Sequence, residues 1–133
     1  MILDSSAVIA VLQGEPEAMD FVRALHGAAE ARISAANWFE SAILVDQRGD
    51  AAARAGFEDF FNRFGITVEP VTLDHARRAR AAYRQFGRGR HPAQLNFGDC
   101  FAYALAQERG EPLLFKGSDF AQTDITPALP ARP

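Results

Sequence analysis

Along the chain, short apolar runs that are typical of buried strands alternate with longer segments in which apolar residues recur at helical spacing. Short apolar runs predict strands at 1–3, 66–71 and 113–115, and a weaker one at 32–34. Between them, apolar residues recur every three or four positions, which predicts helices at 7–13, 15–26, after Ser34, from Asp50 to Gly65, from Thr72 to Phe86, and after Asn96. This alternation predicts a three-layer α/β/α sandwich with a mainly parallel central sheet and right-handed crossovers.

Capping residues stand where these helices should begin. Ser5 or Ser6 can cap the first helix, and the later helices follow the capping residues Ser34, Asp50, Thr72 and Asn96. In the helix after Thr72, the spacing predicts an inward face formed by Leu73, Ala76, Ala79, Tyr83 and Phe86.

The size and composition of the chain predict one domain over residues 1–133. The 133 residues are 48% hydrophobic, which is enough for a core of its own. The segment 127–133 contains three prolines, and we expect it to pack loosely. The single cysteine, Cys100, lies in an apolar helix and indicates a reducing compartment. The sequence shows no secretion signal or membrane span, so we expect a cytoplasmic protein without membrane contact.

The charge is distributed unevenly. The net charge is −3, but residues 77–90 contain six arginines and no acid, so the rest of the chain sums to −9. Such a basic stripe on an acidic body is typical of a nucleic-acid contact that is separate from an acidic site. The alternative is an ordinary solvated helix face. We call these six residues the arginine stripe: Arg77, Arg78, Arg80, Arg84, Arg88 and Arg90.

Four acids, which we call the acidic cluster, stand where a purely structural sequence would not need them: Asp4, Glu40, Asp99 and Asp119. Asp4 and Asp119 follow strands, which places them at the carboxyl edge of a parallel sheet. Glu40 projects from the apolar side of its helix, although it could also be a single acid at the helix margin. Asp99 precedes seven uncharged residues, and it could equally complete a capping box with Asn96.

Four neighbouring carboxylates cannot all stay ionised without a cation, because like charges raise one another's pKa. Ligation by oxygen alone favours Mg²⁺, with Mn²⁺ possible, and the three histidines are too scattered to indicate zinc. The sequence also lacks the glycine-flanked serine of many hydrolases and the glycine-rich loops that bind phosphate.

Four segments resemble the PIN domain and, more narrowly, the VapC ribonuclease toxins of bacterial toxin–antitoxin pairs. They are Met1-Ile2-Leu3-Asp4-Ser5-Ser6-Ala7, the helix around Glu40, the stretch from Leu95-Asn96-Phe97-Gly98-Asp99 to Ala106, and Leu113-Leu114-Phe115-Lys116-Gly117-Ser118-Asp119-Phe120. The resemblance implies a Mg²⁺-dependent endoribonuclease that uses the acidic cluster, a homodimer, and inhibition by a cognate VapB-type antitoxin. Many PIN domains carry an acid where this chain has Gly117, so the role of Asp119 stays open.

These observations lead to a hypothesis of metal-assisted hydrolysis of RNA. Asp4 and Asp99 would bind the ion directly, and Glu40 and Asp119 would bind through water or hold a second ion. The side chains that would orient water are Ser6, Asn96 and Ser118, and the arginines would hold the RNA backbone.

Two other classes of protein share some of these features. A receiver-type phosphoacceptor also has an aspartate at a strand end and a late lysine such as Lys116, but it needs an acid pair after the first strand, where this chain has serines. A catalytically silent PIN-like interaction module stays open, because sequence alone does not demonstrate metal binding.

Overall fold

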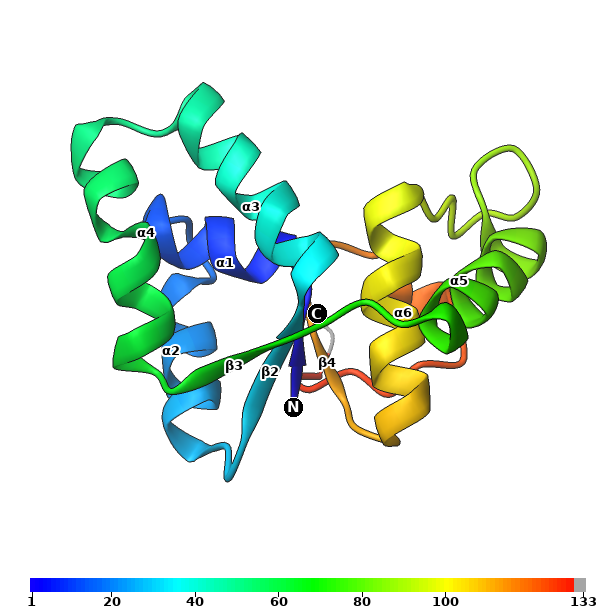
Figure 1. Ribbon diagram of the computed structural model, residues 1–133. Coiled ribbons are helices and arrows are strands. Elements are labelled where there is room, and N and C mark those ends of the chain that lie inside the picture. The colour runs from blue at the N-terminus through cyan, green and yellow to red at the C-terminus, as the bar shows by residue number, and fades with distance from the viewer. Residues whose placement is uncertain (131–133) are drawn as a thin grey trace.

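The computed structural model describes residues 1–130 and has a parallel sheet between two layers of helices (Figure 1). The strands are β1 (Ile2–Leu3), β2 (Ala31–Ser34), β3 (Ile66–Glu69) and β4 (Leu113–Leu114). Their order in the sheet is β3-β2-β1-β4, and every neighbouring pair is parallel. The predicted three-layer α/β/α architecture is therefore confirmed.

The helices divide between the two faces of the sheet (Figure 1). One layer contains α1 (Ser5–Leu12), α2 (Ala18–Gly27), α3 (Ala35–Arg48) and α4 (Ala51–Arg63). The other contains α5 (Leu73–Phe86) and α6 (Phe97–Arg109), and a short 3₁₀ helix, η1 (Phe120–Gln122), follows β4.

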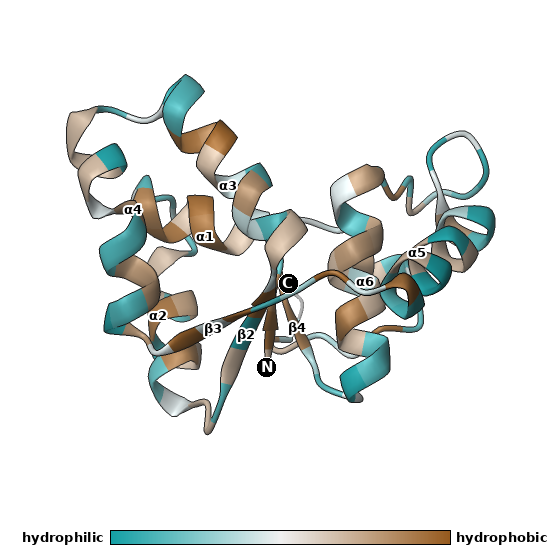
Figure 2. Ribbon diagram, viewed as in Figure 1, coloured by the Kyte–Doolittle hydropathy of each residue, from teal (hydrophilic) through white to brown (hydrophobic). Residues whose placement is uncertain are grey.

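Successive strand residues supply two separate cores, because side chains alternate across a sheet. Leu3 and Leu114 pack among α1 to α4, whereas Ile2 and Leu113 pack with α5 and α6. Figure 2 shows brown, apolar residues where these layers meet and a largely teal α5 at the outside. The short strands are thus covered on both faces, as their lack of polar alternation predicts.

Most of the predicted helix caps are present, and one differs in a way that matters. Side-chain oxygens of Ser34, Asp50, Thr72 and Asn96 accept hydrogen bonds from the first turns of α3, α4, α5 and α6. However, α1 begins at Ser5, and its capping residue is Asp4 rather than a serine. The first acid of the acidic cluster therefore also ends β1 and starts α1.

The inward face predicted for α5 is wrong in part. Ala79 and Phe86 are buried as predicted, but Leu73 is 66% exposed and Tyr83 is 43% exposed. His75 is buried instead, because its side chain completes the capping box with Thr72 and its Nε2 pairs with Glu108 on α6. The buried face of α5 therefore differs from the one that the apolar spacing predicts.

The end of the described chain packs more closely than its prolines predict. Pro127 pairs with Leu113 beside the sheet, and the Ala128 N–H donates to the Leu113 carbonyl (2.8 Å). Leu129 also packs against the core of α1 to α4, whereas the rest of the segment expected to be loose, 131–133, lies outside the described residues. Over residues 1–130, every helix is too short or too polar to cross a membrane.

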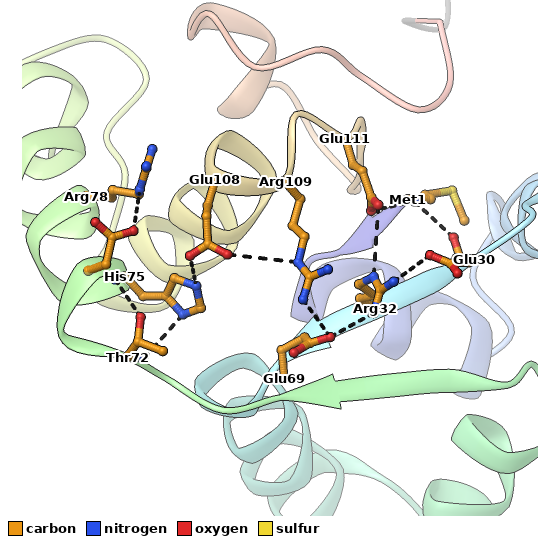
Figure 3. Close-up of polar contacts among 11 residues, drawn as sticks. Met1, Glu30, Arg32, Glu69, Thr72, His75, Arg78, Glu108, Arg109 and Glu111 are labelled. Atoms are coloured by element: carbon orange, nitrogen blue, oxygen red, sulfur yellow. Dashed lines mark hydrogen bonds and ion pairs between the residues drawn. The ribbon is translucent and has the colours of Figure 1, made fainter.

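A set of ion pairs, which we call the ion-pair network, surrounds Arg32 on β2 and Arg109 on α6 (Figure 3). The Glu69 carboxylate lies between the two guanidinium groups, 2.8 Å from Arg32 and 3.0 Å from Arg109. Arg32 also pairs with Glu30 (2.5 Å) and lies 4.0 Å from Glu111, and Arg109 lies 3.9 Å from Glu108. Each glutamate in this network therefore faces a cation.

Candidate active site

Asp4 is held rigidly where β1 meets α1. Its N–H donates to the Leu114 carbonyl (3.0 Å), and its Oδ2 accepts from the Ser6 N–H (3.0 Å). Asp4 is only 3% exposed, and its Oδ1 is buried without a hydrogen-bond partner among the described residues. Burial raises the pKa of Asp4 to about 6, opposed by the hydrogen bonds from Ser6 and supported by the charge of Glu40. The result is a fixed carboxylate with an unused oxygen.

Glu40 reaches the same edge from α3, and contacts from three elements position it. The Ser5 hydroxyl, at the start of α1, donates to Glu40 Oε1, and Asn37 Nδ2 lies 3.5 Å from the same oxygen. Asn37 is fully buried and also donates to the Gly98 carbonyl on α6 (2.9 Å). A Cβ atom at residue 98 would overlap the Glu40 carboxylate, so the glycine makes room for it. Asn37 thereby fastens α3 and Glu40 to the first turn of α6.

Asp99 lies in that first turn, where it both helps to cap the helix and experiences the charges of the other acids. The Asp99 N–H donates to Asn96 Oδ1 (2.9 Å) and the Asn96 N–H donates to Asp99 Oδ2 (3.0 Å), which confirms the predicted capping box. The pKa of Asp99 is raised to about 7, chiefly by burial and then by the charge of Asp4, with smaller contributions from Glu40 and Asp119. A capping role alone would lower this pKa, so the cap does not account for the whole environment of Asp99.

Asp119 is the most loosely placed of the four acids. It is exposed, it precedes η1 without making a side-chain cap, and its charge contributes least of the three to the pKa of Asp99. Gly117 before it has φ +98°, a conformation that favours glycine. Asp119 therefore belongs to the same edge but is not fixed there by contacts like those of Asp4.

The loop that carries Asp119 is nevertheless tied down at its start. The Lys116 N–H donates to the Ser6 hydroxyl oxygen (3.0 Å), and Lys116 Nζ pairs with Glu15 and with Glu17 (3.5 Å). Ser6, which the sequence suggested as a residue that orients water, thus joins α1 to the loop after β4. Ser118, suggested for the same role, is exposed in that loop.

The acidic cluster offers the ligand type that a hard divalent cation prefers, but its side chains are not arranged around a common point. Within residues 1–130, no group of three or more His, Cys, Asp or Glu side chains is arranged so that it could hold a metal ion. The ligands offered are nevertheless carboxylates, two of them with raised pKa values, and Asp4 has an unpartnered oxygen. Binding an ion therefore requires the carboxylates to turn toward one another.

The arginine stripe is largely free of intramolecular ion pairs. Arg77, Arg80, Arg84, Arg88 and Arg90 are exposed, and within residues 1–130 none of them pairs with an acid. Arg78 differs, because its Nε bonds to Asp74 (2.8 Å) and its Nη1 to Gln107 (3.3 Å). Arg90 lies over the Tyr83 ring, 5.4 Å from its centroid. The stripe thus offers exposed cations to a partner.

Three positions that shape this edge were not assigned to it from the sequence: Asn37, Gly98, and Ser5, which was named only as a possible helix cap. For Asn37 a signal was available, because it is a polar residue one turn before Glu40 on the buried side of the helix. The roles of Ser5 and Gly98 depend on contacts between distant segments, and the sequence gives no comparable signal for them.

Comparisons with known proteins agree on one family. The family model "PIN domain" matches residues 1–125. Ribonuclease VapC28 of Mycobacterium tuberculosis is 47% identical over 133 residues, covering 99% of this chain and all of the relative.

Among solved structures, the chain is similar to VapC20 of Mycobacterium tuberculosis, described as a sarcin–ricin loop cleaving toxin. The TM-score is 0.76 at 18% identity, with 94% of this chain and 95% of that chain covered. A toxin–antitoxin complex from Klebsiella pneumoniae gives a TM-score of 0.68 at 18% identity over 92% of each chain. At this identity the two structures support the fold.

Proposed function

The chain belongs to the PIN-domain family, among the proteins named VapC ribonucleases, and from this premise we propose that it is a metal-dependent endoribonuclease toxin. The observation that carries the proposal is the placement of the acids: Asp4 is buried with an unpartnered Oδ1, and Glu40 is held against the first turn of α6, which contains Asp99. Burial, together with the charges of Asp4, Glu40 and Asp119, raises the pKa of Asp99 to about 7, in agreement with this placement. Carboxylates that lie at one sheet edge repel one another when they are ionised, and a bound divalent cation would relieve this repulsion.

Mg²⁺ is the ion we propose, with Mn²⁺ as the alternative; when bound, it supplies Lewis-acid stabilisation of the phosphodiester and a water of lowered pKa. Asp4 and Asp99 would hold it directly, since Asp4 is rigid and has a free Oδ1. Glu40, positioned by Ser5 and Asn37, and the looser Asp119 would complete the site through water or hold a second ion.

The chain's own residues also limit how protons can move. Each histidine is engaged elsewhere: His26 packs against Phe64, His75 pairs with Glu108, and His91 Nδ1 accepts from the Ala93 N–H (3.0 Å). We therefore propose that the proton of the attacking water passes to a carboxylate of the acidic cluster or to solvent.

The arginine stripe would bind the RNA backbone without selecting a sequence. Replacing Arg77, Arg80 and Arg84 with Ala should weaken RNA binding. It should also flatten the salt dependence of affinity by roughly 0.7 in log–log slope for each lost phosphate contact. An unchanged slope would show that α5 does not touch RNA.

We further propose a cognate VapB-type antitoxin, supported by the VapC names of the relatives and by the toxin–antitoxin complex among similar structures. A homodimer is proposed from the family resemblance alone. The antitoxin would occlude the acidic cluster, presenting a cation to carboxylates that otherwise hold metal. Co-purification with the product of the adjacent reading frame should suppress cleavage, and sedimentation of the free protein tests the dimer.

We also propose that residues 1–133 form a single domain.

The decisive test is incubation of the purified protein with total RNA, with Mg²⁺ and with EDTA. Cleavage should require Mg²⁺. Asp4→Asn should stay inactive at every Mg²⁺ concentration, whereas Asp119→Asn should recover part of its activity at high Mg²⁺, because its carboxylate is exposed and loosely held. If the wild type neither binds Mg²⁺ nor cuts RNA, the chain is a silent interaction module instead.

A further inference from the structure

Phe97, the first residue of α6, presents an aromatic ring to solvent. Its side chain is 80% exposed, the highest value among the large exposed hydrophobic residues of the described chain. The ring packs edge-on against Phe101 one turn later, with ring centroids 5.1 Å apart and planes at 68°. This contact fixes the orientation of the ring while most of its surface stays open.

The backbone of Phe97 lies close to the acidic cluster. Phe97 directly precedes Gly98, whose Cα position adjoins the Glu40 carboxylate, and it stands two residues before Asp99. Its exposed neighbours on the N-terminal side, Gln94 and Asn96, are polar.

A free cation is fastened to the same segment. The Arg88 N–H donates to the Leu95 carbonyl (3.0 Å), and Leu95 in turn donates to the Phe86 carbonyl (3.0 Å). These bonds hold the basic loop after α5 beside the residues that lead into α6, as Figure 1 shows. Arg88 is exposed and forms no ion pair within residues 1–130.

We propose that Phe97 stacks a nucleobase of single-stranded RNA next to the bond that is cut, while Arg88 contacts a backbone phosphate of the same strand. The inference rests on the proposed ribonuclease function and adds a base-binding subsite to it. A nucleotide combines an aromatic face with an anion, and this segment offers an exposed aromatic face and an exposed cation at the start of the helix that carries Asp99. Phe97 touches no reacting atom, so it is a positioning residue.

The test is cleavage of a randomised pool of short single-stranded RNA by the wild type, Phe97→Ala and Phe97→Tyr. Loss of one stacked base should raise KM about 5- to 150-fold with little change in kcat. It should also flatten the base preference at one position beside the cut, and Tyr should restore both. The matched control is Met19→Ala on α2, which removes a 61% exposed apolar side chain from the other helix layer. Arg88→Ala should reduce the salt slope of binding by about 0.7.

The possible outcomes separate this inference from the proposed function. A wild type that does not cut RNA overturns both. Cleavage by Phe97→Ala with unchanged KM and base preference overturns only the subsite. If sedimentation shows that Phe97→Ala separates a dimer while base preference is retained, a second copy of the chain covers the ring and the inference is wrong. Failure of Tyr to restore preference also contradicts stacking.

Discussion

The acidic cluster and the ion-pair network use the same kinds of side chain in opposite ways. In the network, Glu69 lies between Arg32 and Arg109, at 2.8 and 3.0 Å. In the acidic cluster, Asp99 faces the charges of Asp4, Glu40 and Asp119, and its pKa rises to about 7. The charges of the ion-pair network are neutralised within the chain, whereas those of the acidic cluster would need a cation from outside it.

This difference separates stability from function. Carboxylates that face cations stabilise the folded state, and replacing one of them leaves a partly buried cation without its partner. Carboxylates that face one another oppose folding and persist only if something else requires them. Neutralising an acid should therefore have opposite effects on stability in the two regions.

The largest effect is expected for Asp99→Asn, which should reduce RNA cleavage by about a thousandfold or more, because a proposed metal ligand is lost. In EDTA the variant should melt at the same or a higher temperature than the wild type, since asparagine keeps the capping oxygen and removes a like charge. Melting curves beside a cleavage assay decide between the two roles of Asp99.

Asp74→Asn is the matched control for Asp99→Asn, because Asp74 is also a first-turn acid, on α5, but its pKa is lowered by the hydrogen bond to Arg78. This variant should cut RNA normally. Clear destabilisation of Asp99→Asn in EDTA would mean that capping is its main role.

Gly98→Ala should reduce cleavage by roughly 10- to 100-fold, because the new Cβ must displace the Glu40 carboxylate. Gly56→Ala on α4 is the control: a Cβ there meets open space, and it should stabilise the helix by about 0.5–1 kcal/mol without changing cleavage. Equal activity of both variants would contradict the role given to Glu40.

In the ion-pair network, Glu69→Gln should lower the melting temperature by roughly 3–8 °C, because Arg32 and Arg109 lose their shared partner. RNA cleavage at low temperature should be retained. The exposed Glu58 on α4 provides the control, since Glu58→Gln should change melting very little. A melting temperature equal to that of the wild type would remove the contrast between the two regions.

The smallest effect is a pH dependence of the metal-free protein. Asp4 and Asp99 have folded pKa values of about 6 and 7, above roughly 3.9 for an unfolded Asp, so the folded state binds more protons between these values. Their contribution to stability is present below about pH 4 and is lost as pH rises through 7. The melting temperature of Asp99→Asn should therefore exceed that of the wild type by a few degrees more at pH 8 than at pH 5. A difference that does not vary with pH would contradict the raised pKa of Asp99.

Local signals predicted much of this molecule. The capping boxes after Thr72 and Asn96, and the position of Asp4 at a strand end, depend on residues a few positions apart, and they are present. Fold class followed from the alternation of buried strands and amphipathic helices.

The failures concern contacts between distant segments. In α5 the buried face contains His75, which pairs with Glu108 on α6, whereas Leu73, placed inside by the apolar spacing, is exposed. The support of Glu40 by Ser5, and the bond from Asn37 to Gly98, join segments 35 and 61 residues apart. The sequence thus indicated which acids to examine but not how they are held.

The bond from the Asp4 N–H to Leu114 has a consequence for the timing of toxicity. β1 lies between β2 and β4, so the strand that delivers Asp4 gains its second neighbour only when the last strand has been made. Asp99 and Asp119 are also synthesised late. A chain still emerging from the ribosome lacks half of the proposed active site. If the proposed function holds, the nascent chain would therefore be unable to cut the surrounding RNA until synthesis is nearly complete.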